Sequence, residues 1–327
     1  MTGKLLLGAH VSTAGGVEKA PVRGVETTCD TIQIFAKPPN RWAARALAEE
    51  NVAAFKAAVA ETGIGPVFAH SLYLVNLASP DEPLWQKSID ALVDDLERCE
   101  LLGLPGLVLH PGSHKGSGEE VGMARVAAAL DEVHARLPGY QVQVWLEITA
   151  GQGDHLGYTF DHIRRMMEAV AQPERLAVCF DTAHAFAAGY ELRTPEAFEA
   201  TWAEFDRVLG LRHLRAVHLN DTVKELGSRV DRHEQVGKGK LGLDTFRLLV
   251  NDPRFRGIPM VLELDLGDDE FRANLALTLQ DMGLLDRAAG TWQTLAADLP
   301  LPPDTQFTGP DRRKLYELSP AEWESRI

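Results

Sequence analysis

Short apolar segments recur along the chain, and longer stretches of mixed character separate them. Several of these segments are nearly continuous in valine, isoleucine, leucine and phenylalanine, which is typical of parallel strands that are covered on both faces. The pattern predicts strands at Leu5–His10, Thr31–Phe35, Pro66–His70, Gly106–His110, Gln141–Glu147, Leu176–Asp181, His213–His218 and Ile258–Glu263.

Between the predicted strands, apolar residues recur at spacings of three and four, which indicates amphipathic helices. Gly103 is placed to close one helix as its C-terminal cap, and Thr194 followed by Pro195 is placed to begin another. Residues 15–27 carry a weaker helical pattern. The clearer predicted helices are Glu49–Glu61, Pro83–Leu102, Glu119–Leu137, Phe160–Val170, Pro195–Leu209, Leu243–Val250 and Asp269–Met282.

Strands that alternate with helices in this way predict an α/β protein with a (β/α)8 TIM barrel as its single domain, over residues 1–284. A doubly wound open sheet is the alternative, but Gly15 and Gly16 lack the further glycine spacing of a dinucleotide-binding turn. Residues 285–327 are rich in proline and also carry aromatic residues. We expect them to form a C-terminal extension that is packed on the barrel or partly ordered.

The composition is that of a globular protein, with 45% hydrophobic and 24% charged residues. Cys29, Cys99 and Cys179 are widely separated, so we expect buried thiols in a reducing compartment. No segment approaches the ~20 apolar residues of a membrane span, which predicts a soluble, cytoplasmic protein. The net charge of −14 lowers the expectation of a nucleic-acid partner, but bound divalent cations would reverse the local field.

The candidate chemistry lies at the ends of the predicted strands. In a (β/α)8 barrel the catalytic groups lie at the C-terminal ends of the strands. Carboxylates gathered at one rim would repel one another unless divalent cations lay between them, and mixed nitrogen and oxygen ligands suit zinc or manganese. From the third strand to the eighth, each predicted strand ends on a histidine or a carboxylate: His70, His110, Glu147, Asp181, His218 and Glu263.

Two further elements extend this set. His184 follows Asp181 by three residues, which places both on one short strand-to-loop turn. Asp231 and His233 alternate as on an extended segment, so their side chains lie on one side. The set exceeds the needs of one metal ion, whereas three zinc ions would use all of it if one or more carboxylates bridge.

The chain also contains the segments GAHVSTAGG (8–16), LHPGSH (109–114), EITAGQG (147–153), FDTAHAFAAGY (180–190), HLND (218–221), GSRVDRH (227–233) and VGKGKLG (236–242). With these segments and the residues above, the sequence closely resembles the endonuclease IV family of apurinic/apyrimidinic (AP) endonucleases, over about residues 5–283. The resemblance implies an enzyme on a (β/α)8 barrel that holds three Zn²⁺ ions, with Mn²⁺ an alternative at one or more sites. It implies cleavage of double-stranded DNA 5′ to an abasic site, which leaves a 3′-hydroxyl and a 5′-deoxyribose phosphate. We expect a monomer with no obligate protein partner, associated with the nucleoid in a prokaryote.

The resemblance also implies how the ligands are shared. Glu147 would bridge the first two ions and Glu263 would also orient the nucleophile, a hydroxide between those ions, so both glutamates are expected to be catalytic. The implied ligands are His70, His110 and Glu147 for the first zinc, Glu147, Asp181, His218 and Glu263 for the second, and His184, Asp231 and His233 for the third.

The loop after the second strand departs from the family pattern. The family typically has K-N-x-R-x-W there, with the arginine inserted into DNA, whereas residues 37–42 are KPPNRW. Asn40 therefore stands in the arginine's place, and Arg41 either acts from a shifted position or is a solvated loop residue. Tyr73 and Leu74 match the family's other DNA-probing residues.

Two other functions fit parts of the same pattern. A sugar isomerase or epimerase would use similar strand-end ligands but fewer metals, and the combination of His184, Asp231 and His233 argues against it. A protein that binds abasic DNA without cleaving it would be favoured by the altered loop, but the intact ligand set argues against it.

Overall fold

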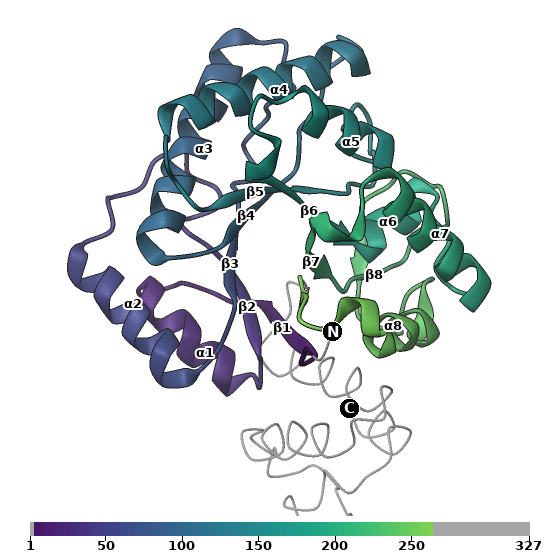
Figure 1. Ribbon diagram of the computed structural model, residues 1–327, viewed down its shortest axis with the longest axis horizontal. Helices are drawn as coiled ribbons and strands as arrows, with labels where there is room; N and C mark the ends of the chain where they lie inside the picture. The colour runs from purple at the N-terminus through teal and green to yellow at the C-terminus, as the bar shows by residue number, and fades with distance from the viewer. Residues whose placement is uncertain (1–2, 264–327) are drawn as a thin grey trace, which may run out of the picture.

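The computed structural model describes residues 3–263, and within them parallel strands close into a barrel that helices surround (Figure 1). The strands follow one another around the barrel in the order β1, β10, β7, β6, β5, β4, β3 and β2. This arrangement confirms the predicted TIM barrel. The strands are β1 (Leu6–His10), β2 (Thr31–Phe35), β3 (Val67–His70), β4 (Gly106–Leu109), β5 (Gln143–Glu147), β6 (Leu176–Asp181), β7 (Leu214–His218) and β10 (Pro259–Leu262).

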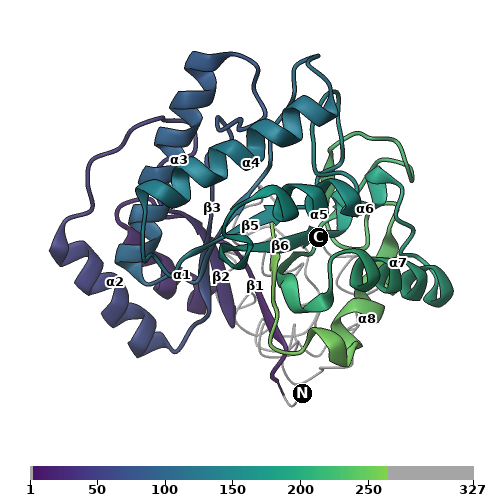
Figure 2. The same cartoon turned by 45° about the horizontal axis from the view of Figure 1, so that its top comes forward.

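The helices stand outside the strands, as the view turned by 45° shows (Figure 2). Gly103 ends α3 in a left-handed conformation with φ 74°, and the Thr194 hydroxyl caps α7 by accepting a hydrogen bond from the Ala197 amide at 3.3 Å. Both caps were predicted. The described helices are α1 (Ala20–Glu26), α2 (Glu49–Thr62), α3 (Glu82–Leu102), α4 (Glu119–Arg136), α5 (Phe160–Ala169), α6 (Thr182–Ala188), α7 (Pro195–Val208) and α8 (Gly242–Asn251).

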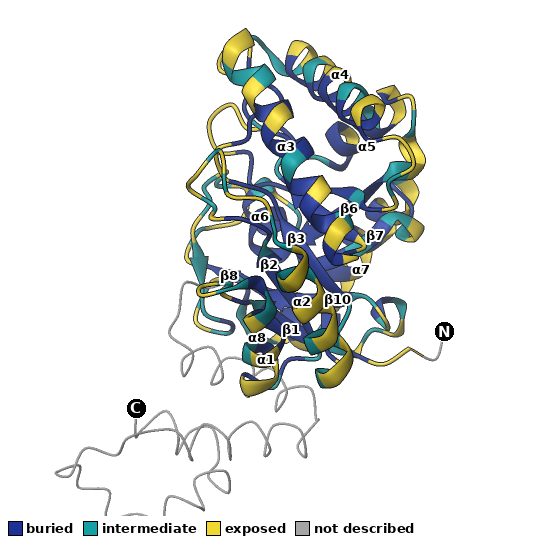
Figure 3. Ribbon diagram, turned by 90° about the vertical axis from the view of Figure 1, so that its left-hand side faces the viewer, coloured by how far each residue is buried: buried dark blue, intermediate teal, exposed yellow. Residues whose placement is uncertain are grey.

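The barrel strands consist almost entirely of buried residues, whereas the helices around them mix buried and exposed ones (Figure 3). Trp145 occupies the barrel interior beside Phe68, and a Cβ atom on Gly106 would come within 1.9 Å of the Trp145 ring. Glycine is therefore required where β4 passes that ring. Because the middle of the barrel is filled, a binding site has to lie at one of its open ends. Cys29, Cys99 and Cys179 are buried free thiols, as expected.

Predictions of local structure were wrong at one turn and at the ends of three strands. Asp181 and His184 do not lie on a simple turn, because Asp181 is the N-cap of helix α6 and accepts a hydrogen bond from the His184 amide at 2.7 Å. His110 and Glu263 each follow the last residue of a strand, and His213 belongs to a 3₁₀ turn. An additional antiparallel ribbon, β8 (Asp221–Thr222) with β9 (His233–Glu234), lies outside the barrel sheet.

The predicted helix at 269–282, the domain boundary at 284 and the extension at 285–327 lie outside the described residues. Within residues 3–263, the structure contains no helix of the length and apolar character that crossing a membrane requires.

Candidate metal centre

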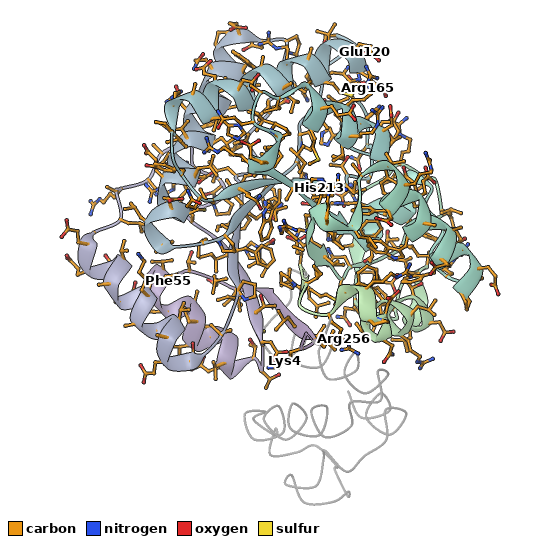
Figure 4. All side chains as sticks on the ribbon, in the orientation of Figure 1. Lys4, Phe55, Glu120, Arg165, His213 and Arg256 are labelled. Atoms are coloured by element: carbon orange, nitrogen blue, oxygen red, sulfur yellow. The ribbon has the colours of Figure 1, made fainter. Side chains whose placement is uncertain are left out.

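The predicted ligands meet at the C-terminal end of the barrel. The opposite end is marked by Lys4, His213 and Arg256, which precede their strands and are labelled in Figure 4. Strands β3, β5, β6 and β7 each end on one of these side chains, and His110 and Glu263 directly follow β4 and β10. Parallel strands place these groups at one rim because their carboxyl ends all face the same way.

Glu147, the last residue of β5, is the centre of this arrangement. Its carboxylate is completely buried. Burial alone would raise the pKa of Glu147, but His110 and His218 outweigh that effect and hold the pKa well below its ordinary value. Its two oxygens lie close to four imidazoles: His70 Nε2 at 3.2 Å, His110 Nε2 at 3.0 Å, His184 Nδ1 at 3.0 Å and His218 Nδ1 at 3.2 Å.

Glu147 belongs to two of the groups whose ligand atoms all lie within 4.8 Å of one another. One group consists of His70, His110 and Glu147. The other consists of Glu147, Asp181, His218 and Glu263, in which His218 Nδ1 lies 2.8 Å from a Glu263 oxygen and 3.7 Å from an Asp181 oxygen. A shared carboxylate between two such sets is the arrangement that a bridging ligand requires.

The loop after β7 brings the remaining predicted ligands to His184. Asp231 lies 3.3 Å from His184 Nε2 and 3.4 Å from His233 Nε2, and the two Nε2 atoms are 3.3 Å apart. Asp181, His184 and His233 also form a group within 4.8 Å. Asp181 therefore lies between the second and third groups, which the sequence did not predict.

Contacts to the loop after β5 hold Asp231 and His233 in place. Arg229 has a left-handed backbone with φ 54°, donates from Nε to the Gly151 carbonyl at 3.0 Å, and places its guanidinium 4.0 Å over the ring of Tyr158. The Asp231 amide donates to the Gln152 side chain at 2.9 Å. The two sequence motifs at 147–153 and 227–233 thus form a single structural unit.

Three residues of the site were missed by the sequence analysis: His10, Gln33 and Asn220. Gln33 Nε2 donates to His10 Nδ1 at 2.9 Å and to Glu263 at 2.5 Å. Asn220 donates to Asp181 at 2.6 Å and accepts from the Glu263 amide at 3.0 Å. One signal could have identified Gln33, because it is a polar residue in the middle of the apolar strand TIQIF.

The carboxylates favour the charged form of the nearby imidazoles. Burial alone would lower the pKa of His70, His184 and His218. Anionic neighbours outweigh burial in each case, so that all three pKa values lie above 6.5. The raising groups include Glu147 beside His70, Asp181 beside His184 and Glu263 beside His218. A cation that binds here has to displace these protons.

We therefore expect the metal-free protein to lose stability as the pH rises. A histidine whose pKa is raised by folding stabilises the folded state below its unfolded value of 6.5, and this contribution disappears as the pH passes the folded value. Urea denaturation of chelator-treated protein between pH 6 and 9 should give a free energy of unfolding that falls toward pH 9. Zinc should remove this decline, and a flat profile without metal would contradict the assigned charges.

Comparison with known proteins places the chain in a family. The family model described as "Xylose isomerase-like TIM barrel" matches residues 24–286. A protein of Chloroflexus aggregans named "Probable endonuclease 4" is 50% identical over 272 residues, which cover 83% of this chain and 95% of that protein. The protein of the same name from Geotalea daltonii is 45% identical over 273 residues, 84% of this chain and 96% of that one.

The chain belongs to the endonuclease IV family. The resemblance seen in its motifs is thereby confirmed. The crystal structure of endonuclease IV from Thermus thermophilus matches with a TM-score of 0.76 at 35% identity, over 85% of this chain and 99% of that one. A 3-keto-D-glucoside 4-epimerase from E. coli shares the fold alone, with a TM-score of 0.60 at 18% identity.

In this endonuclease IV family member, the residues expected to probe DNA lie on two loops at the same end of the barrel. Tyr73 is 69% exposed, and its ring centroid lies 5.8 Å from that of His70. Leu74 is also exposed. Asn40 and Arg41 are exposed in the loop between β2 and α2, where the Arg41 amide donates to the Pro38 carbonyl at 3.2 Å.

A cavity of about 1140 Å³ connects this loop to the candidate metal centre. Its lining includes Pro38 and Pro39 of the loop together with Tyr73, His10 and Glu263. A molecule that entered the cavity would therefore touch both the loop and a predicted catalytic carboxylate.

Helix α3 anchors the same loop. The Lys37 ammonium is completely buried, lies 2.6 Å from Asp94 and 3.2 Å from Asp95, and donates to the Ala91 carbonyl at 3.0 Å. Burial raises the pKa of Asp95 to about 6, although Lys37 opposes the shift. The first residue of the KPPNRW segment is thus fixed to the barrel, whereas Asn40 and Arg41 are exposed.

Replacing Lys37 by methionine is expected to lower the free energy of unfolding at pH 8 by about 3–5 kcal/mol, because Asp95 is left charged and buried. The deficit should shrink at pH 5, where Asp95 becomes protonated and needs no counter-charge. Urea denaturation at both pH values measures it. The control is Lys4→Met, because the Lys4 ammonium pairs with Asp30 at 2.6 Å but is exposed. This substitution should change the free energy of unfolding little. Equal deficits at both pH values would contradict the assigned role.

Proposed function

We propose that the protein is a DNA-repair endonuclease that uses zinc to hydrolyse the phosphodiester bond 5′ to an abasic site in double-stranded DNA. One observation carries the proposal. The nine side chains predicted as ligands converge at one end of the barrel, in groups that share Glu147 and Asp181. They do so in a chain that is 50% identical to a protein named endonuclease 4.

The donor set supports three zinc ions, with Mn²⁺ an alternative at one or more positions. Imidazole nitrogens and carboxylate oxygens are ordinary zinc ligands, and the buried Glu147 needs positive charge on both its oxygens. The proposed sets are His70, His110 and Glu147, then Glu147, Asp181, His218 and Glu263, and finally His184, Asp231 and His233.

Zinc supplies Lewis acidity and lowers the pKa of a water molecule to about 7. The protein's own contribution is to hold the reacting groups in place. Glu263 is fixed by His218 and Gln33 on its two oxygens and by Asn220 at its amide, and it borders the cavity. From this position its carboxylate orients the attacking water toward the phosphorus. The products would be a 3′-hydroxyl and a 5′-deoxyribose phosphate.

We assign damage recognition to exposed side chains on the two loops at this end of the barrel. Tyr73 and Leu74 on one loop and Asn40 and Arg41 on the other would enter the DNA at the lesion. An abasic site resists such entry least, because it has no base to unstack. The anchored Lys37 would hold the second loop at a fixed position relative to the metal groups.

The decisive experiment treats a labelled duplex that contains one tetrahydrofuran abasic analogue with zinc-loaded protein. We expect a single nick 5′ to the analogue, a 3′ end that a polymerase can extend, and about three zinc ions per chain by elemental analysis. Chelation should abolish the nick, and added zinc should restore it. Binding without incision would favour the non-catalytic alternative. One metal per chain together with activity on a ketose would favour the epimerase alternative.

A further inference from the structure

Gln33, in strand β2, contacts residues of the candidate metal centre. Its side chain is completely buried in the middle of β2. Its amide contacts three residues from other parts of the barrel: His10 at the end of β1, His218 at the end of β7 and Glu263 after β10. A glutamine that contacts two predicted ligands of one metal group can determine the orientation of both side chains.

The orientation of the Gln33 amide follows from the chemistry of Glu263. A carboxylate only accepts hydrogen bonds, so the NH₂ group of Gln33 must face Glu263, which it does at 2.5 Å. The second proton of that NH₂ group faces His10 Nδ1 at 2.9 Å. The carbonyl oxygen is then left for His218, and it lies 2.9 Å from His218 Nε2.

This orientation in turn decides which nitrogen of His218 can bind a metal. A carbonyl oxygen only accepts, so His218 Nε2 must carry the proton that it donates to Gln33. The free lone pair is then on Nδ1, which lies 3.2 Å from Glu147 and 2.8 Å from Glu263, inside the second group. Groups behind metal ligands commonly fix imidazole tautomers in this way, and their loss typically costs about 10–100-fold in metal affinity.

We propose that Gln33 is a positioning residue of the second metal group: its amide selects the Nε2–H tautomer of His218 and holds Glu263 in its orientation. This inference rests on the proposed zinc-dependent function, since it concerns how that site is assembled. It assigns a role to a side chain that binds no metal and lies outside the predicted ligand set.

Gln33→Leu should fold, because leucine suits an apolar buried strand, and it should weaken one of the three zinc ions by about 10–100-fold in competition with a chelator. The incision kcat should fall while the KM for abasic duplex changes little. Gln86→Leu is the matched control. Gln86 donates to Glu132 at 3.0 Å between α3 and α4, and its removal should leave zinc binding and incision unchanged. Unaltered zinc affinity in folded Gln33→Leu would overturn the proposal.

Gln33→Glu separates the two parts of the role. A glutamate still accepts from His218 Nε2, but it cannot donate to Glu263. We expect the Nε2–H tautomer of His218 to persist in Gln33→Glu and to be lost in Gln33→Leu, while both variants lose kcat. Tautomers are measured from the imidazole nitrogen shifts of ¹⁵N-histidine-labelled protein.

The wild-type protein provides a test that does not depend on any variant. Zinc-loaded protein should show His218 protonated at Nε2, and an Nδ1–H tautomer would overturn the proposal. If the wild-type protein takes up no zinc, the proposed function fails by itself. The Gln33 contact is then tested in the metal-free protein, where a slowly exchanging Nε2 proton on His218 is expected and a freely exchanging one would overturn it.

Discussion

Replacing Glu147 by glutamine is expected to lower the rate of abasic-site incision by about 10³-fold or more, which corresponds to about 4 kcal/mol of lost transition-state stabilisation. Glutamine keeps the shape of the side chain but removes the charge that faces four imidazoles and two proposed metal ions. Its NH₂ group cannot accept from a histidine or bind a cation. Bound zinc should fall below three ions per chain by elemental analysis.

A matched control for this variant is Glu119→Gln. Glu119 accepts a hydrogen bond from Tyr158 at 2.7 Å and lies near His162, so it also combines a carboxylate with an imidazole. It belongs to none of the groups that could hold a metal among the described residues. Its replacement should leave the zinc content and the incision rate close to those of the parent. A Glu147→Gln protein with three zinc ions and a normal rate would refute the bridging role.

The strands were predictable because they carry two signals at once. Most residues of segments such as TIQIF and LAVCFD are apolar, and helical stretches lie before and after each of them. The barrel could be predicted from the repetition of this strand–helix pattern, without a role for any single residue. The missed helix α6 is only seven residues long and follows β6 directly, so it offers no full helical period of its own. Strands β8 and β9 have two residues each, and no sequence pattern can reveal strands of that length.

The ligands were predictable for a different reason. A strand end is a position in the sequence, so His70, Glu147, Asp181 and His218 could be assigned to one rim before any distance was known. The roles of Gln33 and His10 could not be assigned, because they depend on register. The two residues are partners across β1 and β2, and Gln33 reaches Glu263 only because β10 lies on the other side of β1.

The role of Asp181 in two metal groups could not be predicted from the local sequence either. Its sequence neighbours place it beside His184, but its membership of two metal groups depends on where the loop at 227–233 folds back. That loop is held by Arg229 and Gln152, whose contacts cross about eighty residues of sequence. Long-range contacts of polar side chains carry no local pattern, so this part of the site emerges only in the folded chain.

Glu263→Gln is expected to separate catalysis from binding. The Glu263 side chain borders the cavity, where it would meet the attacking water. It is not one of the side chains assigned to DNA recognition. Loss of its charge should therefore lower kcat by about 10²–10⁴-fold, the usual range for a group that positions or accepts a proton in the transition state. The affinity for abasic duplex should stay within about threefold, because the groups assigned to recognition are intact.

Single-turnover incision and fluorescence anisotropy with the same duplex measure the two quantities separately. Glu225→Gln is the control, since Glu225 is an exposed carboxylate in the loop after β7 and pairs with Lys240 at 2.7 Å. Its replacement should alter neither quantity appreciably. An unchanged rate in Glu263→Gln would remove the catalytic role of Glu263. A loss of DNA affinity with an unchanged rate at saturating duplex would instead mean that Glu263 contributes to substrate binding, because uniform loss of ground-state and transition-state interactions appears in KM and not in kcat.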